Sequence, residues 1–187
     1  MIATRRRRRF SALNTVLSIV IVIAISWGVD GLTHRSKTAQ PIVGSYETAV
    51  IDRVIDGDTI NVSINNKIYT VRLIGLDAPE SVHPDQTRNT PEGILAADYV
   101  KQALPRGKIV YLSKDVSQTD QYGRLLRYVW LTRPGDSDSE IRSGMFNAIL
   151  ILAGYANQGT YQPDVSYAEK FKIYQREAKT AHRGLWK

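Results

Sequence analysis

Five short runs rich in β-branched residues are the feature that most constrains how this chain can fold. They span residues 49–55, 60–64, 68–74, 108–113 and 125–131. Apolar and polar residues partly alternate within the runs, and Asp56-Gly57 and Asn65-Asn66 supply turns between the first three. This pattern is typical of short antiparallel strands that bury one face.

Three further segments have the spacing and the end signals of helices. The first begins with Thr90 as N-cap and Pro91 at the first helical position, and it closes before Pro105. The second covers residues 145–153, and the third covers residues 164–182, where apolar side chains recur every three or four positions. Strands followed by helices indicate an α+β domain. Five short strands suit a small β-barrel of the OB type, so we predict that barrel with about three helices.

The N-terminus has the pattern of a transmembrane or signal helix. Five arginines, Arg5 to Arg9, precede the uncharged stretch 10–29, which is long enough to cross a bilayer core as a helix. The most apolar part is only 17–25, so a cleaved signal peptide stands beside an uncleaved membrane anchor as an alternative. Basic residues that flank a membrane segment usually stay in the cytoplasm, so we expect the arginines there. We therefore expect the folded part outside the cytoplasm, either membrane-anchored or secreted.

Composition divides the chain into three parts. Residues 1–29 form the basic and apolar segment, and residues 30–47 mix Gly, Ser, Thr and Pro without periodicity, as linkers do. The strand pattern then starts, so we expect the folded domain to be 48–187. Of the net charge of +7, the N-terminal arginines supply most, and the domain itself is only mildly basic. The chain has no cysteine, which excludes disulfides, a thiolate nucleophile and Cys-ligated zinc.

Three short segments contain most of the residues suited to chemistry. Residues 55–59 place two carboxylates around a glycine, a grouping that suits a hard cation. Residues 71–80 carry a strand arginine followed by two carboxylates, and residues 119–124 form a turn that ends in an arginine. Taken singly, each has an ordinary interpretation as a hairpin turn, a solvated strand residue or a loop.

Taken in order, the three segments resemble the thermonuclease family, of which staphylococcal nuclease is the familiar member. The resemblance covers about residues 50–186 and implies an OB barrel that hydrolyses phosphodiester bonds of DNA and RNA with Ca²⁺. By motif position, it implies that Asp58 and Asp77 bind calcium through their side chains and that Ala78 binds it through its backbone carbonyl. Asp56 matches an acidic neighbour of the metal rather than a ligand.

The same resemblance assigns the remaining roles. Arg72, Glu80 and Arg124 fall on the family's catalytic arginine, glutamate and second arginine. Tyr122 lies in the third motif and Tyr161 fits one of the family's base-stacking tyrosines, so both are expected to bind substrate. Gln121 stands where the family has a lysine before Tyr122, and no partner for Tyr161 is identified.

These residue types suit phosphodiester hydrolysis. A divalent cation can neutralise a phosphate and position water, Glu80 can accept the water's proton, and the forked guanidinium groups of Arg72 and Arg124 can stabilise the transition state. We predict a monomeric calcium-dependent nuclease with a preference for single-stranded substrates. The alternative is a non-catalytic module of the same fold that binds oligonucleotide or protein; the presence of Glu80 and both arginines favours the enzyme.

Overall fold

The computed structural model describes residues 45–187, which all belong to one compact unit. The predicted transmembrane or signal segment, and the linker up to residue 44, lie outside the described residues. Within the described part, no helix has both the length and the apolar character needed to span a membrane.

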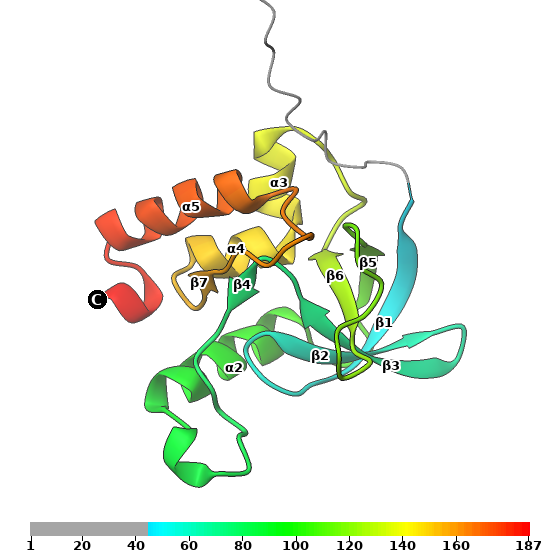
Figure 1. Ribbon diagram of the computed structural model, residues 1–187, viewed down its shortest axis with the longest axis horizontal. Helices are drawn as coiled ribbons and strands as arrows, with labels where there is room; N and C mark the ends of the chain where they lie inside the picture. The colour runs from blue at the N-terminus through cyan, green and yellow to red at the C-terminus, as the bar shows by residue number, and fades with distance from the viewer. Residues whose placement is uncertain (1–44) are drawn as a thin grey trace, which may run out of the picture. The chain divides into compact units, whose positions relative to one another are not determined.

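Five strands close into a barrel in the order β1-β2-β3-β6-β5, which confirms the predicted five-stranded architecture (Figure 1). Their bounds are Glu47–Val54 for β1, Thr59–Ile64 for β2, Lys67–Leu73 for β3, Ile109–Ser113 for β5 and Leu125–Trp130 for β6. Four of the neighbouring pairs are antiparallel, but β3 and β6 run parallel. The expectation of an entirely antiparallel set is therefore wrong for the pair that closes the barrel. A parallel pair needs a long crossover, and here the chain between the two strands includes a helix and β5.

Two local irregularities shape the first half of the barrel. Asn65 and Asn66 both adopt positive φ angles, +50° and +63°, which suit the tight turn between β2 and β3. In β1, Ile51 pairs with Val62 and Arg53 pairs with Asn61, so Asp52 is an extra residue that forms a β-bulge.

Among the helices, the last three α-helices pack together beside the barrel, and the first lies apart from them against β1 (Figure 1). Four are α-helices: α2 (Pro91–Ala103), α3 (Asp138–Gly144), α4 (Phe146–Leu152) and α5 (Ala168–Thr180). Two are 3₁₀ turns: η1 (Gln86–Arg88) and η2 (Gly184–Trp186). The predicted helices are present as α2, α4 and α5. The short helix α3 and the two-residue strands β4 (Leu76–Asp77) and β7 (Asn157–Gln158) were not predicted.

Helix α5 begins four residues later than its sequence pattern predicts. The Asp164 carboxylate accepts hydrogen bonds from the backbone nitrogens of Val116 (2.9 Å) and Ser117 (2.8 Å). Ser166 in turn donates through its backbone nitrogen and its hydroxyl to Asp115. These contacts hold 164–167 as a loop against another loop, so the helix starts only at Ala168.

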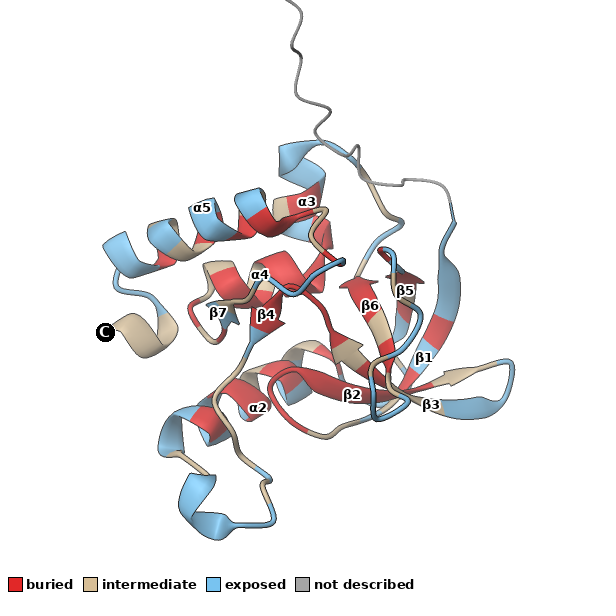
Figure 2. Cartoon of the chain, in the orientation of Figure 1, coloured by how far each residue is buried: buried red, intermediate tan, exposed pale blue. Residues whose placement is uncertain are grey.

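The core continues from the inside of the barrel into the space under the helices (Figure 2). Inward-facing residues of the strands, such as Val62, Val71 and Leu73, are almost fully buried. Asn147 of α4 is buried among them: its Oδ1 accepts from Val129 N (2.8 Å), and its Nδ2 donates to Ile74 O (2.9 Å). One buried amide thus joins α4 to β6 and to the end of β3.

We expect Asn147→Ala to lower the free energy of unfolding by about 3 kcal/mol, because it leaves two buried backbone groups unpaired. Urea unfolding followed by circular dichroism measures the loss. Ser143→Ala on the exposed side of α3 is the control and should cost less than about 0.5 kcal/mol. A loss below about 1 kcal/mol for Asn147→Ala would contradict the bridging role.

Candidate functional site

The loop between β1 and β2 brings Asp58 against the segment that follows β3. Gly57 allows this close approach, because a Cβ at that position would lie 2.6 Å from the Ala78 Cβ. The Asp58 Oδ2 accepts a hydrogen bond from the Ala78 backbone nitrogen at 3.1 Å. Two motifs separated by about twenty residues therefore meet side by side.

Arg72 bridges the two aspartates that the sequence assigns to metal binding. Its Nη1 lies 2.7 Å from the Asp58 Oδ2, and its Nη2 lies 2.9 Å from the Asp77 Oδ1. Asp58 is buried, whereas the Asp77 side chain is 60% exposed. Burial raises the pKa of Asp58 and the adjacent Arg72 guanidinium opposes that rise. The two carboxylates thus converge on one point at the edge of the barrel.

Glu80 lies beside this pair and is positioned by the start of α2. Its backbone carbonyl accepts a hydrogen bond from the Thr90 nitrogen at 2.9 Å, and Thr90 in turn caps α2. A hydrogen bond with the Asp56 carboxyl raises the pKa of Glu80, and partial burial adds to the rise. A glutamate whose pKa is raised is better matched to proton transfer near neutral pH.

Arg124 is aimed by the turn that precedes it. Gly123 has a φ angle of +78°, which favours glycine, and the Asp120 Oδ1 accepts from the backbone nitrogens of both Tyr122 and Arg124 at 2.9 Å. The Asp120 Oδ2 lies 2.7 Å from the Arg124 Nε. Asp120 is a positioning residue that the sequence reasoning did not assign, although it lies within the third motif.

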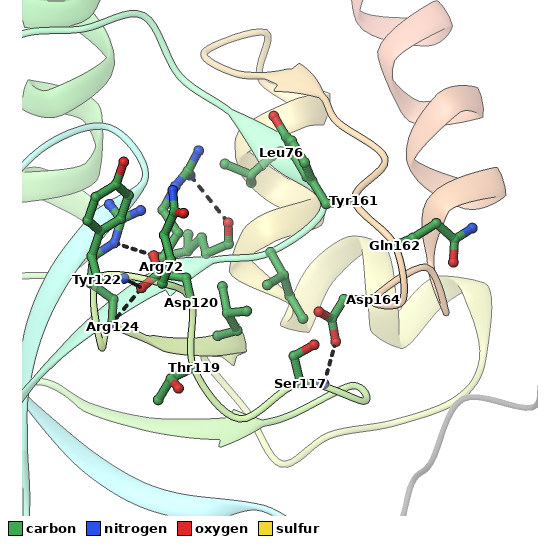
Figure 3. Close-up of a pocket in the computed structure, with 14 residues that line it drawn as sticks. Arg72, Leu76, Ser117, Thr119, Asp120, Tyr122, Arg124, Tyr161, Gln162 and Asp164 are labelled. Carbon is green, nitrogen blue, oxygen red and sulfur yellow. Dashed lines mark hydrogen bonds and ion pairs between the residues drawn. The ribbon is translucent and has the colours of Figure 1, made fainter.

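The side chains line two adjoining pockets that share Arg72 and Arg124. The acidic cleft, of about 500 Å³, contains all the predicted metal-binding residues, both arginines and Glu80. The tyrosine pocket, of about 470 Å³, is lined by Tyr122 and Tyr161 (Figure 3). Both tyrosines are mostly exposed, at 75% and 54%. The structure therefore brings every residue predicted for the site to one continuous surface.

Two buried carboxylates that the sequence reasoning missed tie the loops of the tyrosine pocket together. Asp164 binds the backbone of 116–117, and Asp115 binds Ser166, so each loop supplies a carboxylate to the other. Asp164 was instead expected at the start of the third helix. Neither residue has a sequence motif, because the pairing joins segments about fifty residues apart.

The acidic cleft has the donor chemistry of a site for a hard cation. Asp58 and Asp77 offer carboxylate oxygens and Ala78 offers its carbonyl, and oxygen donors of these kinds are the ligands that Ca²⁺ takes in proteins. Asp58 is only 8% exposed, and burial raises its pKa in spite of the adjacent Arg72, so a metal cation would add to the compensation that Arg72 supplies. Among residues 45–187, no three His, Cys, Asp or Glu side chains gather into a metal-binding cluster. A cation held here would therefore complete its coordination with water or substrate oxygens.

A closed five-stranded barrel with these carboxylates and arginines in one cleft defines a protein whose site suits an anionic ester. The family described as staphylococcal nuclease homologue matches residues 70–187. The chain is 34% identical over 176 residues to a thermonuclease of Staphylococcus hyicus, covering 93% of this chain and 97% of that protein. It is 35% identical over 171 residues to a thermonuclease of Staphylococcus intermedius, covering 91% and 94%.

A further relative, endonuclease YncB of Bacillus subtilis (strain 168), is 29% identical over 154 residues, which cover 82% of this chain and 66% of that protein. The chain belongs to the staphylococcal nuclease family. The predicted family and the predicted enzyme class, a nuclease, are thereby confirmed. The roles of the individual site residues stay predictions.

Proposed function

We propose that this nuclease hydrolyses phosphodiester bonds of single-stranded DNA or RNA with the help of Ca²⁺. In this proposal Asp58, Asp77 and the Ala78 carbonyl hold the cation, Glu80 is the general base, and Arg72 and Arg124 stabilise the transition state. The observation that supports it most is the convergence of the two aspartates on Arg72, at 2.7 and 2.9 Å, beside a glutamate of raised pKa.

The negative charge of a phosphodiester must be neutralised before it can be attacked, and these residues can supply that neutralisation. A phosphodiester is an anion and repels a nucleophile, and a bound divalent cation supplies Lewis-acid polarisation of the phosphate. Arg72 and Arg124 line the same cleft and can each donate two hydrogen bonds to phosphate oxygens. Charge grows on those oxygens in the transition state, so donors fixed in advance stabilise it more than the ground state.

Glu80 handles the proton of the attacking water. Its carboxyl lies beside that of Asp56, and its backbone carbonyl accepts a hydrogen bond from Thr90, which helps to hold the residue at the cleft. Its raised pKa makes its carboxylate a stronger base than that of an ordinary glutamate.

The tyrosine pocket suits the base of a nucleotide whose phosphate lies at the arginines. Tyr122 and Tyr161 expose their rings, and stacking of a base on an aromatic ring contributes about 1–3 kcal/mol without requiring a particular base. Unpaired bases are available for stacking, which supports a preference for single strands. We also propose that the chain acts as a monomer, because all the site residues come from one barrel.

The direct test is cleavage of single-stranded DNA by the full-length chain with Ca²⁺, with Mg²⁺ and with a chelator. We expect cleavage with Ca²⁺, little with Mg²⁺ and none with chelator, because a site of few fixed ligands favours the larger ion with flexible coordination. Glu80→Gln should lower kcat by at least about 10²-fold, as loss of a general base does.

The matched control is Glu92→Gln, an exposed residue on the first turn of α2, which should leave kcat unchanged. Equal saturating rates with Mg²⁺ and Ca²⁺ would contradict the proposed cation. Tight binding of single-stranded DNA without any cleavage would point instead to a non-catalytic binding module.

Arg124→Lys should be nearly as damaging as Arg124→Ala, with kcat lower by at least about 10²-fold, since an ammonium group cannot reproduce a forked pair of donors. Single-turnover cleavage measures the chemical step, and thermal melting reports whether the turn is intact. Arg133→Lys, at an exposed position after β6, is the control. Near-normal cleavage by Arg124→Lys would show that Arg124 acts only as a structural residue of its turn.

We further propose that the nuclease domain lies outside the cytoplasm, as the arginines at 5–9 and the uncharged stretch 10–29 suggest. A reporter that is active only outside the cytoplasm, fused after Lys187, should be active. A reporter that works only in the cytoplasm should be silent, and its activity would contradict the orientation. Cell fractionation then separates the two forms, with full-length protein in membranes for an anchor and a shortened species in the medium for a cleaved signal.

A further inference from the structure

The acidic cleft extends beyond the proposed catalytic residues along the outer face of the barrel. There it is lined by Arg53 of β1, Asn61 of β2 and Thr70 of β3. On the basis of the proposed function, we propose that these three residues form a second phosphate subsite. It would bind the phosphodiester group next to the one that is cleaved, on the side away from the tyrosine pocket.

The β-bulge in β1 places Arg53 on this face. Ile51 is buried and points into the barrel, so strict alternation would also turn Arg53 inward. The extra residue Asp52 shifts the register, and Arg53 then pairs with Asn61 and is exposed. Asn61 pairs in turn with Thr70, so the three side chains form one row across three strands. Bulges often redirect a side chain in this way next to an active site.

The row is rich in hydrogen-bond donors that have no acceptor. Asn61 is only 7% exposed and lines the cleft, and its Oδ1 accepts from the Thr70 hydroxyl at 3.0 Å. Within residues 45–187 its side-chain nitrogen forms no hydrogen bond and is not among the enclosed unpaired atoms, so this donor is open to the cleft. No carboxylate of this part of the chain pairs with Arg53, and its neighbour Asp52 is paired with Arg106 at 3.3 Å. An amide and a guanidinium facing one opening suit an anion.

The spacing of the row suits a neighbouring phosphate. On β3, Thr70 lies two residues from Arg72. On β2, Asn61 lies two residues from Thr59, which pairs with Arg72. Two residues along a strand span about 6.6 Å. This step is comparable to the separation of consecutive phosphates in an extended single strand. A strand that places its scissile phosphate at Arg72 therefore brings the next phosphate to Arg53 and Asn61.

A nucleic acid bound in this way makes contacts on both sides of the cleaved bond. The tyrosine pocket takes a base on one side, and the Arg53 row takes the backbone on the other. Cleavage of an interior phosphodiester bond allows contacts at both the tyrosine pocket and the Arg53 row. A bond that has no neighbouring phosphate on the Arg53 side allows contact at the tyrosine pocket alone. The subsite would therefore make the enzyme favour cleavage inside longer strands.

The test compares Arg53→Gln with the wild type of the full-length chain on two substrates, a dinucleoside monophosphate and a single-stranded octanucleotide. The dinucleoside has only the scissile phosphate, so it cannot reach the subsite. We expect Arg53→Gln to raise KM for the octanucleotide about tenfold with little change in kcat, as loss of one charged hydrogen bond does. Kinetic constants for the dinucleoside should not change.

Salt dependence gives an independent measure. Removing one phosphate contact should make the plot of log(kcat/KM) against log salt concentration less steep by about 0.7 for the octanucleotide. Asn61→Asp, which places a carboxylate in the row without a change of size, should raise KM for the octanucleotide alone. Arg133→Gln removes an equal charge outside the cleft and is the control.

Equal effects of Arg53→Gln on both substrates, or no effect on either, would overturn the subsite. The proposed nuclease function would stand in both cases if the wild type cleaves the octanucleotide. Failure of the wild type to cleave it with Ca²⁺ would instead overturn the proposed function. Melting temperatures of the variants exclude a general loss of folding as the cause of a raised KM.

Discussion

The parallel pairing of β3 with β6 is the interaction on which both the barrel and the site depend. It closes the barrel, and its register sets Val71 opposite Leu125 and Arg72 opposite Leu126. Arg124 immediately precedes β6, so the same hydrogen bonds that close the sheet bring it to the cleft that contains Arg72. Two arginines that are far apart in sequence thus share one pocket because of backbone pairing.

Around these arginines the protein holds several carboxylates, and their environments differ. Asp58 is buried, and burial raises its pKa. The contact with Asp56 raises the pKa of Glu80. Asp120 is held by Arg124 and by two backbone nitrogens. Asp120 has its pKa lowered by these hydrogen bonds, against the effect of burial. Asp58 and Asp120 are each paired with an arginine at 2.7 Å, but burial still raises the pKa of Asp58, whereas hydrogen bonds lower that of Asp120. The surroundings thus distinguish Asp120, which positions Arg124, from Asp58 and Glu80.

Sequence alone predicted the elements whose residues carry a repeating pattern. The five strands and α2 follow from β-branched runs, turn residues and the Thr90 cap, and the motif residues from the family resemblance. The strands β4 and β7 are too short to show any alternation. The later start of α5 depends on Asp164, whose partners lie in a different loop. The parallel β3–β6 pair could not be predicted, because the residue pattern within a strand does not determine which strand it pairs with.

The outer face of the barrel explains how one sheet can carry both a core and a site. Alternation buries Val71 and Leu73 and leaves Arg72 and Thr70 facing out, so the core determines which residues of β3 can reach a ligand. A slip of one residue would exchange the two sets, which the packed interior prevents. The bulge at Asp52 is the local exception, since it changes the facing of Arg53 without disturbing Ile51. A cationic side chain is added to the cleft in this way while the core keeps its apolar residues.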